Sequence, residues 1–146
     1  PAADFFTFAY TTALETDEIL TEIRFSLPSR DSAGVYLKLE RVAGDFAIAG
    51  PAMQMGLDTN ALCSTIGVGV TGAAAVPQKA VAVESLLQGK KITRELIDDA
   101  GRLVQESVEP IEDTRGSAAY KKKALGAILR RAIAESLRRA EAKWSS

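Results

Sequence analysis

The spacing of the apolar residues changes halfway along this chain of 146 residues, and the change constrains the fold more than any other feature. In the first half, apolar and polar residues alternate, which is typical of half-buried strands. In the second half, apolar residues recur three and four positions apart, which is typical of amphipathic helices. Strands followed by helices in one short chain predict an α+β fold with two layers.

Four segments are predicted as strands of an antiparallel meander, because no helical pattern separates them. They are Glu22–Leu27, Val35–Val42, Phe46–Met55 and Ala61–Val70. In the second segment, Val35, Leu37 and Leu39 share one face. Pro51 favours a bulge or an edge strand for the third segment. Gly56–Asn60 has the composition of a hairpin turn.

Three helices are predicted in the second half. They cover Gln78–Gly89, Arg94 to about Ser107, and a long segment that follows Ser117. Pro77 precedes the first helix, while Thr93 and Ser117 can cap the other two. The last helix carries one continuous apolar stripe, formed by Leu125, Ile128, Leu129, Ala132, Ile133, Leu137 and Ala140. We therefore expect one domain over residues 1–146, with a small antiparallel sheet of about four strands packed against three helices.

The chain contains no histidine and a single cysteine. Without histidine there is no Ser-His-Asp or Cys-His catalytic arrangement and no imidazole ligand for zinc. One cysteine excludes an internal disulfide, a CxxC redox motif and a cysteine-ligated iron–sulfur cluster. Cys63 lies in an apolar run, so we expect a small buried side chain there. No stretch is apolar over the roughly 18 residues of a membrane span, and we expect a cytoplasmic protein.

Gly67, Gly69 and Gly72 match the GxGxxG pattern of dinucleotide-binding loops. In such loops a strand leads into a helix whose N-terminus meets a pyrophosphate. Here Pro77 interrupts the first turns of that helix, and the surrounding pattern is a meander rather than a βαβ unit. The favoured interpretation is a glycine-rich strand end that another stretch of backbone approaches closely.

Basic residues gather in the last predicted helix. Residues 117–143 carry 8 Lys and Arg against 2 Asp and Glu, whereas the whole chain has a net charge of −1. This helix could dock an acidic partner or nucleic acid, which would make the chain a stand-alone interaction module. However, no aromatic residues interleave the basic ones, and the apolar stripe of the helix must be buried. A solvated face, or a face that complements an acidic partner, is therefore favoured over binding to nucleic acid or to a membrane surface. Seven of the eight basic residues lie in three short clusters: Lys121, Lys122 and Lys123, then Arg130 and Arg131, then Arg138 and Arg139.

Two polar segments are further candidates for a site. Asp113–Tyr120 is predicted as a structural corner, in which Asp113 and Arg115 can form a local ion pair. Lys38–Arg41 is followed by a turn at Gly44–Phe46, which projects an aromatic ring. Such a ring can cover a planar, redox-active or nucleotide ligand, and an ordinary core position for Phe46 is the alternative.

Several segments, in this order, resemble one family. They are Phe5-Phe6 with Thr12–Leu14, Glu18–Ile23, Lys38–Arg41 with Gly44–Ala47, Ile66–Gly69, Leu86–Lys90, Asp113–Tyr120 and Leu129–Ala132. Together they resemble the C-terminal domain of the FAD-binding medium subunit of the molybdenum hydroxylases. That family includes carbon monoxide dehydrogenase and xanthine dehydrogenase, and its C-terminal domain is an α+β sandwich. The resemblance extends from about Ala3 to Ala140.

The resemblance implies an oxidoreductase whose FAD is held mostly by upstream domains that this chain lacks. It places Phe46 against the isoalloxazine ring, gives Gly44 and Asp45 the role of setting the turn, and turns Lys38 toward the flavin or its polar edge. These four residues are the cofactor-binding candidates. No catalytic residue and no metal ligand is assigned, because the flavin supplies the chemistry.

The implied partners are the upstream FAD-binding domains, an iron–sulfur small subunit with two [2Fe–2S] clusters, and a large subunit with a molybdenum cofactor. Electrons would pass from the clusters through FAD to an acceptor. Because the chain begins at Pro1 without methionine, we expect a piece of a longer protein. The isolated domain is expected to lack activity, and neither nucleic acid nor a membrane is an expected partner.

Overall fold

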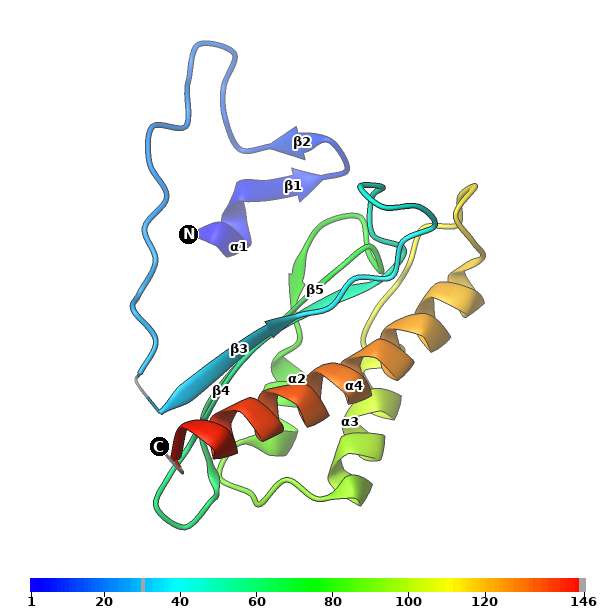
Figure 1. The fold of residues 1–146 in the computed structure, drawn as a ribbon. Coiled ribbons are helices and arrows are strands. Elements are labelled where there is room, and N and C mark those ends of the chain that lie inside the picture. Colours follow the sequence, from blue (N-terminus) through cyan, green and yellow to red (C-terminus); the bar gives the residue numbers. More distant parts are fainter. Residues whose placement is uncertain (30, 145–146) are drawn as a thin grey trace.

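The computed structural model describes residues 1–29 and 31–144. A four-stranded antiparallel sheet in the order β3-β4-β5-β6 is packed against three helices, as the α+β expectation requires (Figure 1). The strands of this sheet are β3 (Ser32–Tyr36), β4 (Gly50–Leu57), β5 (Cys63–Thr71) and β6 (Gln78–Lys79). The helices that pack on it are α2 (Val81–Leu87), α3 (Arg94–Glu106) and α4 (Ala118–Trp144). The remaining elements lie at the N-terminus: α1 (Ala2–Phe5), β1 (Phe6–Phe8) and β2 (Thr11–Thr12).

The core lies between one face of the sheet and the apolar stripe of α4. Met53 of β4 stands in register with Val35 of β3 and Val68 of β5, and all three side chains are buried. Leu129 and Ile133 of α4 are fully buried members of the same core. Alternating strand residues and a helical stripe thus meet in one layer of apolar side chains, as the spacing of the sequence predicts.

Small residues bring α3 and α4 together. A Cβ on Gly126 of α4 would lie 2.5 Å from the carbonyl oxygen of Gly101 in α3, so a larger residue cannot fit without moving the backbone. The caps expected from the sequence are also present. The Thr93 hydroxyl accepts the Leu96 N–H at 3.3 Å, and the Ser117 hydroxyl accepts the Tyr120 N–H at 3.3 Å.

The predicted strand at Glu22–Leu27 is wrong. The segment has no strand partner, and every residue in it is exposed, so its alternating pattern has no core to face. The fourth strand of the sheet is instead β6, which pairs with Val70 and Gly69 of β5. The first predicted helix therefore begins at Val81 rather than Gln78, because Gln78 and Lys79 are used by the sheet.

Pro51 lies in β4, a central strand, so the expected edge strand or bulge at this position is also wrong. Pro51 is only the second residue of the strand, and its carbonyl accepts the Leu37 N–H at 3.1 Å, just beyond the end of β3. The missing N–H of proline thus falls where the regular ladder is ending. Strand β3 starts at Ser32, three residues before the predicted start at Val35, and it ends at Tyr36 rather than Val42. Strand β4 starts at Gly50 rather than at the predicted Phe46.

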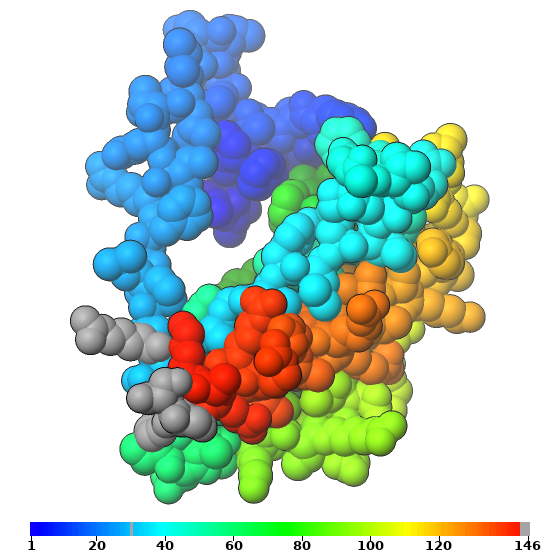
Figure 2. Space-filling model, in the orientation of Figure 1, coloured from blue at the N-terminus to red at the C-terminus, as the bar shows by residue number. Residues whose placement is uncertain are grey.

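Residues 1–29 form a separate layer. None of them is buried, and the short β1–β2 pair and the extended chain after it lie on the side of the sheet away from α4 (Figure 1). Figure 2 shows an open gap between this N-terminal segment and the rest of the molecule. Within the described residues, no helix is both long and apolar enough to cross a membrane.

Candidate functional site

The turn that carries Phe46 is built by Gly44 and Asp45. Gly44 has a φ of +89°, a conformation that favours glycine. The Asp45 carboxylate then accepts the Phe46 N–H at 2.7 Å, and the Asp45 N–H donates to the Val42 carbonyl at 3.1 Å. These bonds fix the backbone of the turn, while Phe46 remains 70% exposed. The alternative of an ordinary core phenylalanine is therefore wrong.

Arg115 braces this turn from the corner before α4. Its guanidinium nitrogen lies 3.2 Å from Asp45 Oδ1, and its Cζ lies 5.4 Å from the centroid of the Phe46 ring. Arg41 adds a second cation, with Nε 3.5 Å from Asp45 Oδ2. The Phe46 N–H and the Arg115 guanidinium hold the pKa of Asp45 below its usual value, so the carboxylate stays ionised.

Lys38 contacts the same turn through its backbone. Its ammonium group donates to the Asp45 carbonyl at 3.0 Å and forms an ion pair with Glu40. Bonding to the Glu40 carboxylate raises the pKa of Lys38, which keeps the lysine charged. The structure therefore brings all four sequence candidates together at one turn, with Lys38 as a brace beneath it.

The corner at Asp113–Gly116 uses different partners from those the sequence indicated. Asp113 accepts the backbone N–H of Arg115 at 2.8 Å, but its salt bridge is with Lys121 of α4, also at 2.8 Å. The Arg115 side chain is thereby free to reach Asp45, 70 positions away in the sequence. No local pattern in the sequence reports such a distant pair. Sequence reasoning therefore missed Arg115 as a member of the site.

The glycine motif is a strand end, as the favoured interpretation had it. Gly67 and Gly69 lie within β5, and Gly72 follows it with a φ of +76°. A Cβ on Gly72 would lie 2.5 Å from the Ala47 carbonyl oxygen, so backbone approaches backbone there. No helix N-terminus follows the motif, because the next element is strand β6.

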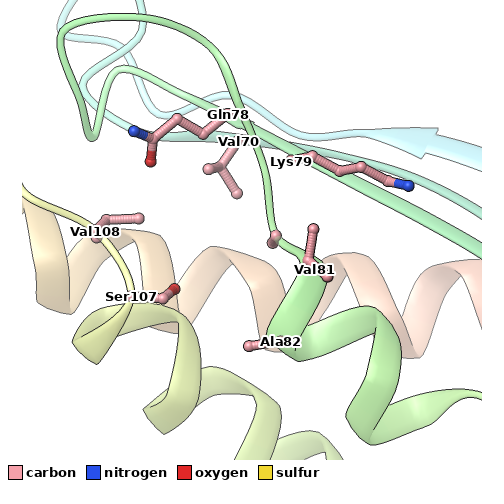
Figure 3. A pocket seen from close by; sticks show the side chains of 8 residues that line it. Val70, Gln78, Lys79, Val81, Ala82, Ser107 and Val108 are labelled. Carbon is pink, nitrogen blue, oxygen red and sulfur yellow. The ribbon is translucent and has the colours of Figure 1, made fainter. Parts of the chain in front are cut away.

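A cavity of about 220 Å³ lies between β6, α2 and the end of α3 (Figure 3). Its walls are mostly short aliphatic side chains such as Val70, Val81 and Val108. Its lysine, Lys79, pairs with Glu84 at 3.1 Å, and the Ser107 hydroxyl donates to the Val104 carbonyl. These polar groups already have partners in the chain, and the cavity presents no acid–base pair for catalysis.

Two wider hollows lie elsewhere. One, of about 820 Å³, separates the N-terminal segment from the outer face of the sheet, where Gly67 and Gly69 leave the surface bare. The other, of about 360 Å³, lies between Lys38 and Arg131 along α4. Phe46 lines none of these three cavities. Its ring is presented on an open surface rather than in a pocket.

Neither metal nor thiol chemistry is indicated within the part of the chain that the structure describes. No group of three or more Asp, Glu or Cys side chains there could hold a metal ion. Cys63 is fully buried, as expected, and burial raises its pKa to about 11. A buried thiol with a high pKa is a poor nucleophile.

Several basic side chains of α4 form salt bridges inside the chain. Lys121 is itself buried, which a purely solvated face would not require. Asp98 of α3 is the partner of Arg130. The bridges are Lys121–Asp113 at 2.8 Å, Lys122–Glu109 at 3.3 Å, Arg130–Asp98 at 3.0 Å, and Arg138 and Arg139 with Glu135 at 2.7 and 2.6 Å.

Known proteins are similar to this chain in sequence and in fold. The carbon monoxide dehydrogenase medium chain of Afipia carboxidovorans is 34% identical over 140 residues, which are 96% of this chain and 48% of that protein. The glyceraldehyde dehydrogenase medium chain of Sulfolobus acidocaldarius is 32% identical over 92% of this chain and 47% of that protein. This chain thus spans about half the length of these relatives.

A solved structure of carbon monoxide dehydrogenase from Hydrogenophaga pseudoflava superposes with a TM-score of 0.87 at 34% identity, covering 93% of this chain and 47% of that one. Quinoline 2-oxidoreductase from Pseudomonas putida 86 shares the fold with a TM-score of 0.86 at 24% identity, covering 94% and 47%. Residues 34–136 match the family described as the CO dehydrogenase flavoprotein C-terminal domain. The chain belongs to that family.

Proposed function

We propose that this chain is the flavin-covering and subunit-packing domain of the FAD-binding subunit of a molybdenum-hydroxylase-type oxidoreductase. Its family is named for a flavoprotein, and its relatives are medium chains of carbon monoxide and glyceraldehyde dehydrogenases. A more distant relative, 25% identical, is the FAD-subunit of nicotinate dehydrogenase from Eubacterium barkeri. The upstream domains of the same subunit would hold most of the FAD.

The observation that carries this proposal is the exposed ring of Phe46 on a fixed turn. Arg115 and Asp45 hold the turn from the protein side, and Phe46 is 70% exposed. A flat aromatic surface of this kind fits the face of an isoalloxazine ring by stacking. Because Phe46 lies outside the cavities, it suits a cover over a ligand held by another domain rather than a complete binding pocket.

When bound, FAD supplies the redox chemistry, and this chain contributes position and shielding. Phe46 would exclude water from one face of the flavin. Gly44 and Asp45 would hold the ring at the required angle, and Lys38 would hold the turn through its bond to the Asp45 carbonyl. The ion pair with Glu40 and the bond to the Asp45 carbonyl occupy the ammonium group of Lys38, which supports a role in holding the turn.

The N-terminal segment would pack against the upstream FAD-binding domains. Its large apolar side chains are exposed, which is unusual for a surface that faces only water. Among them are Phe8, Tyr10, Ile19, Phe25 and Leu27. The partner subunits, one with iron–sulfur clusters and one with a molybdenum cofactor, complete the proposed path of electrons through FAD to an acceptor.

The test uses the complete FAD-containing subunit and iodide as a collisional quencher of flavin fluorescence. Phe46→Ala removes the ring, so iodide should quench the flavin more efficiently than in the parent protein. Val81→Ala is the matched control, because Val81 is a half-exposed apolar residue on α2, away from the turn. Equal quenching in the parent and in Phe46→Ala would refute the covering role.

A further inference from the structure

Arg115 occupies the protein-facing side of the Phe46 ring. Its side chain is three-quarters buried, and it spans from the corner before α4 to the Asp45 carboxylate and the Phe46 ring. The Arg115 Nε atom is buried without a hydrogen-bond partner, so the guanidinium is held by Asp45, the ring and its own backbone corner. A long side chain loses much conformational freedom in such a position, which indicates a specific task.

Arginine fits this position better than lysine would. A planar guanidinium can lie against an aromatic face and donate to a carboxylate at the same time. The carboxylate it meets is the one that accepts the Phe46 N–H, so one side chain secures both the backbone and the ring of the turn. The corner is itself fixed, because Asp113 holds the Arg115 N–H and pairs with Lys121.

We propose that Arg115 is a positioning residue for the Phe46 turn and that the Arg115–Asp45 pair sets the reduction potential of the flavin which Phe46 covers. This inference rests on the proposed function, because it requires a flavin against Phe46. Reduction adds negative charge to a flavin. A positive group behind the ring therefore raises the potential, and a negative group lowers it. In the intact pair the two effects oppose each other.

The opposing charges give a test that separates charge from structure. Arg115→Met leaves the Asp45 carboxylate without its main cation, so the flavin potential should fall. Asp45→Asn leaves Arg115 uncompensated, so the potential should rise, while the Asn oxygen can still accept the Phe46 N–H. Each variant should change the ratio of reduced to oxidised flavin at a fixed potential on the order of threefold to tenfold.

The experiment is a spectroscopic redox titration of the complete FAD-containing subunit. Glu135→Gln is the matched control, because it breaks an ion pair on α4 that involves Arg138 and Arg139 and does not touch the turn. We expect that control to leave the potential unchanged. Arg115→Lys keeps the positive charge, so its potential should stay closer to that of the parent than that of Arg115→Met. Arg115→Gln also removes the charge, and it replaces Arg115→Met should that variant not fold.

Shifts of Arg115→Met and Asp45→Asn in the same direction would mean that the pair acts only as a structural clamp, and that result would overturn the proposal. Unchanged potentials in both would overturn it as well. The iodide quenching of Phe46→Ala tests the proposed function separately from the redox titration. Increased quenching there, together with unchanged potentials in the charge variants, would retain the covering role of Phe46 and reject the role of Arg115.

Discussion

The N-terminal segment and the rest of the chain use similar residues with opposite results. Residues 1–29 contain many aromatic and aliphatic side chains, and none is buried. In residues 31–144, the same kinds of side chain form one core between the sheet and α4. The difference lies in whether neighbouring strands and a helix are available to cover the side chains. Strand β4 has neighbours on both sides and a helix across its face, whereas the segment around Phe25 has neither.

This difference teaches that an alternating pattern reports a preference for burial, and only the fold supplies the burial. Glu22–Leu27 alternates as clearly as Val35–Leu39, but only the second segment has a strand to pair with and a helix to cover it. We interpret the exposed apolar residues of the N-terminal segment as a surface made for another domain. Substitutions can test whether the two regions contribute to stability as differently as their burial indicates.

The largest effect is expected from truncation of the core. Leu129→Ala on α4 removes a fully buried side chain and should lower the free energy of unfolding by about 2–5 kcal/mol. Leu27→Ala in the N-terminal segment should change it by less than about 0.5 kcal/mol, because Leu27 is 95% exposed. Urea unfolding of this chain measures both. Similar losses for the two variants would erase the distinction between the regions.

The next largest loss of stability is expected in the glycine motif, at Gly72. Gly72→Ala forces a side chain into a left-handed conformation and against the Ala47 carbonyl, so we expect a loss of about 1–3 kcal/mol or more. Gly67→Ala meets no atom within 4 Å and should cost less than about 1 kcal/mol. Thermal unfolding compares them. An equal loss in both would contradict the close backbone approach at Gly72.

Two carboxylates that precede α4 should also differ in their contribution to stability, because their lysine partners differ in burial. Asp113→Ala leaves Lys121, whose side chain is only 4% exposed, without its anion, and should cost about 1–3 kcal/mol. Glu109→Ala removes the exposed partner of Lys122 and should cost less than about 0.5 kcal/mol. Urea unfolding at pH 7 tests the pair. If Asp113→Ala left the free energy of unfolding unchanged, the Ile111 carbonyl alone would satisfy Lys121, and this prediction would be contradicted.

The smallest effect on stability is expected on lowering the pH. Arg138 and Arg139 lower the pKa of Glu135 from 4.5 to about 2 in the folded protein. The stabilisation by this group is therefore complete above pH 4.5 and is lost as the pH falls toward 2. The difference in Tm between the parent chain and Glu135→Gln should shrink over that window. Because Glu135 lies on the surface, the change is small, and a constant difference from pH 6 to pH 2.5 would contradict it.

The sequence predicts the architecture better than the details of the sheet. The stripe of α4 and the caps at Thr93 and Ser117 are local patterns, and the structure confirms them. Strand β6 has only two residues and exists because β5 lies beside it, so no periodicity could reveal it. The prediction of an edge strand or a bulge at Pro51 was wrong because its place at the end of the ladder depends on where β3 stops.

The candidate site was predicted in part for the same reason. Gly44, Asp45 and Phe46 are neighbours in sequence, and Lys38 is seven positions from Asp45, so a local reading could join them. Arg115 joins the turn through a contact that spans 70 positions. Its partner from the sequence pattern, Asp113, is taken by Lys121, which the helical geometry of α4 brings to the corner. Long-range pairs of this kind need the fold.

The central claim is that Phe46 lies against a flavin, and the most direct measurement is the fluorescence lifetime of the flavin in a Phe46→Trp variant of the complete subunit. An indole in contact with a flavin quenches it by electron transfer. We therefore expect a much shorter lifetime in Phe46→Trp, and the parent lifetime in the control Val81→Trp on α2. Equal lifetimes in Phe46→Trp, Val81→Trp and the parent would contradict the claim.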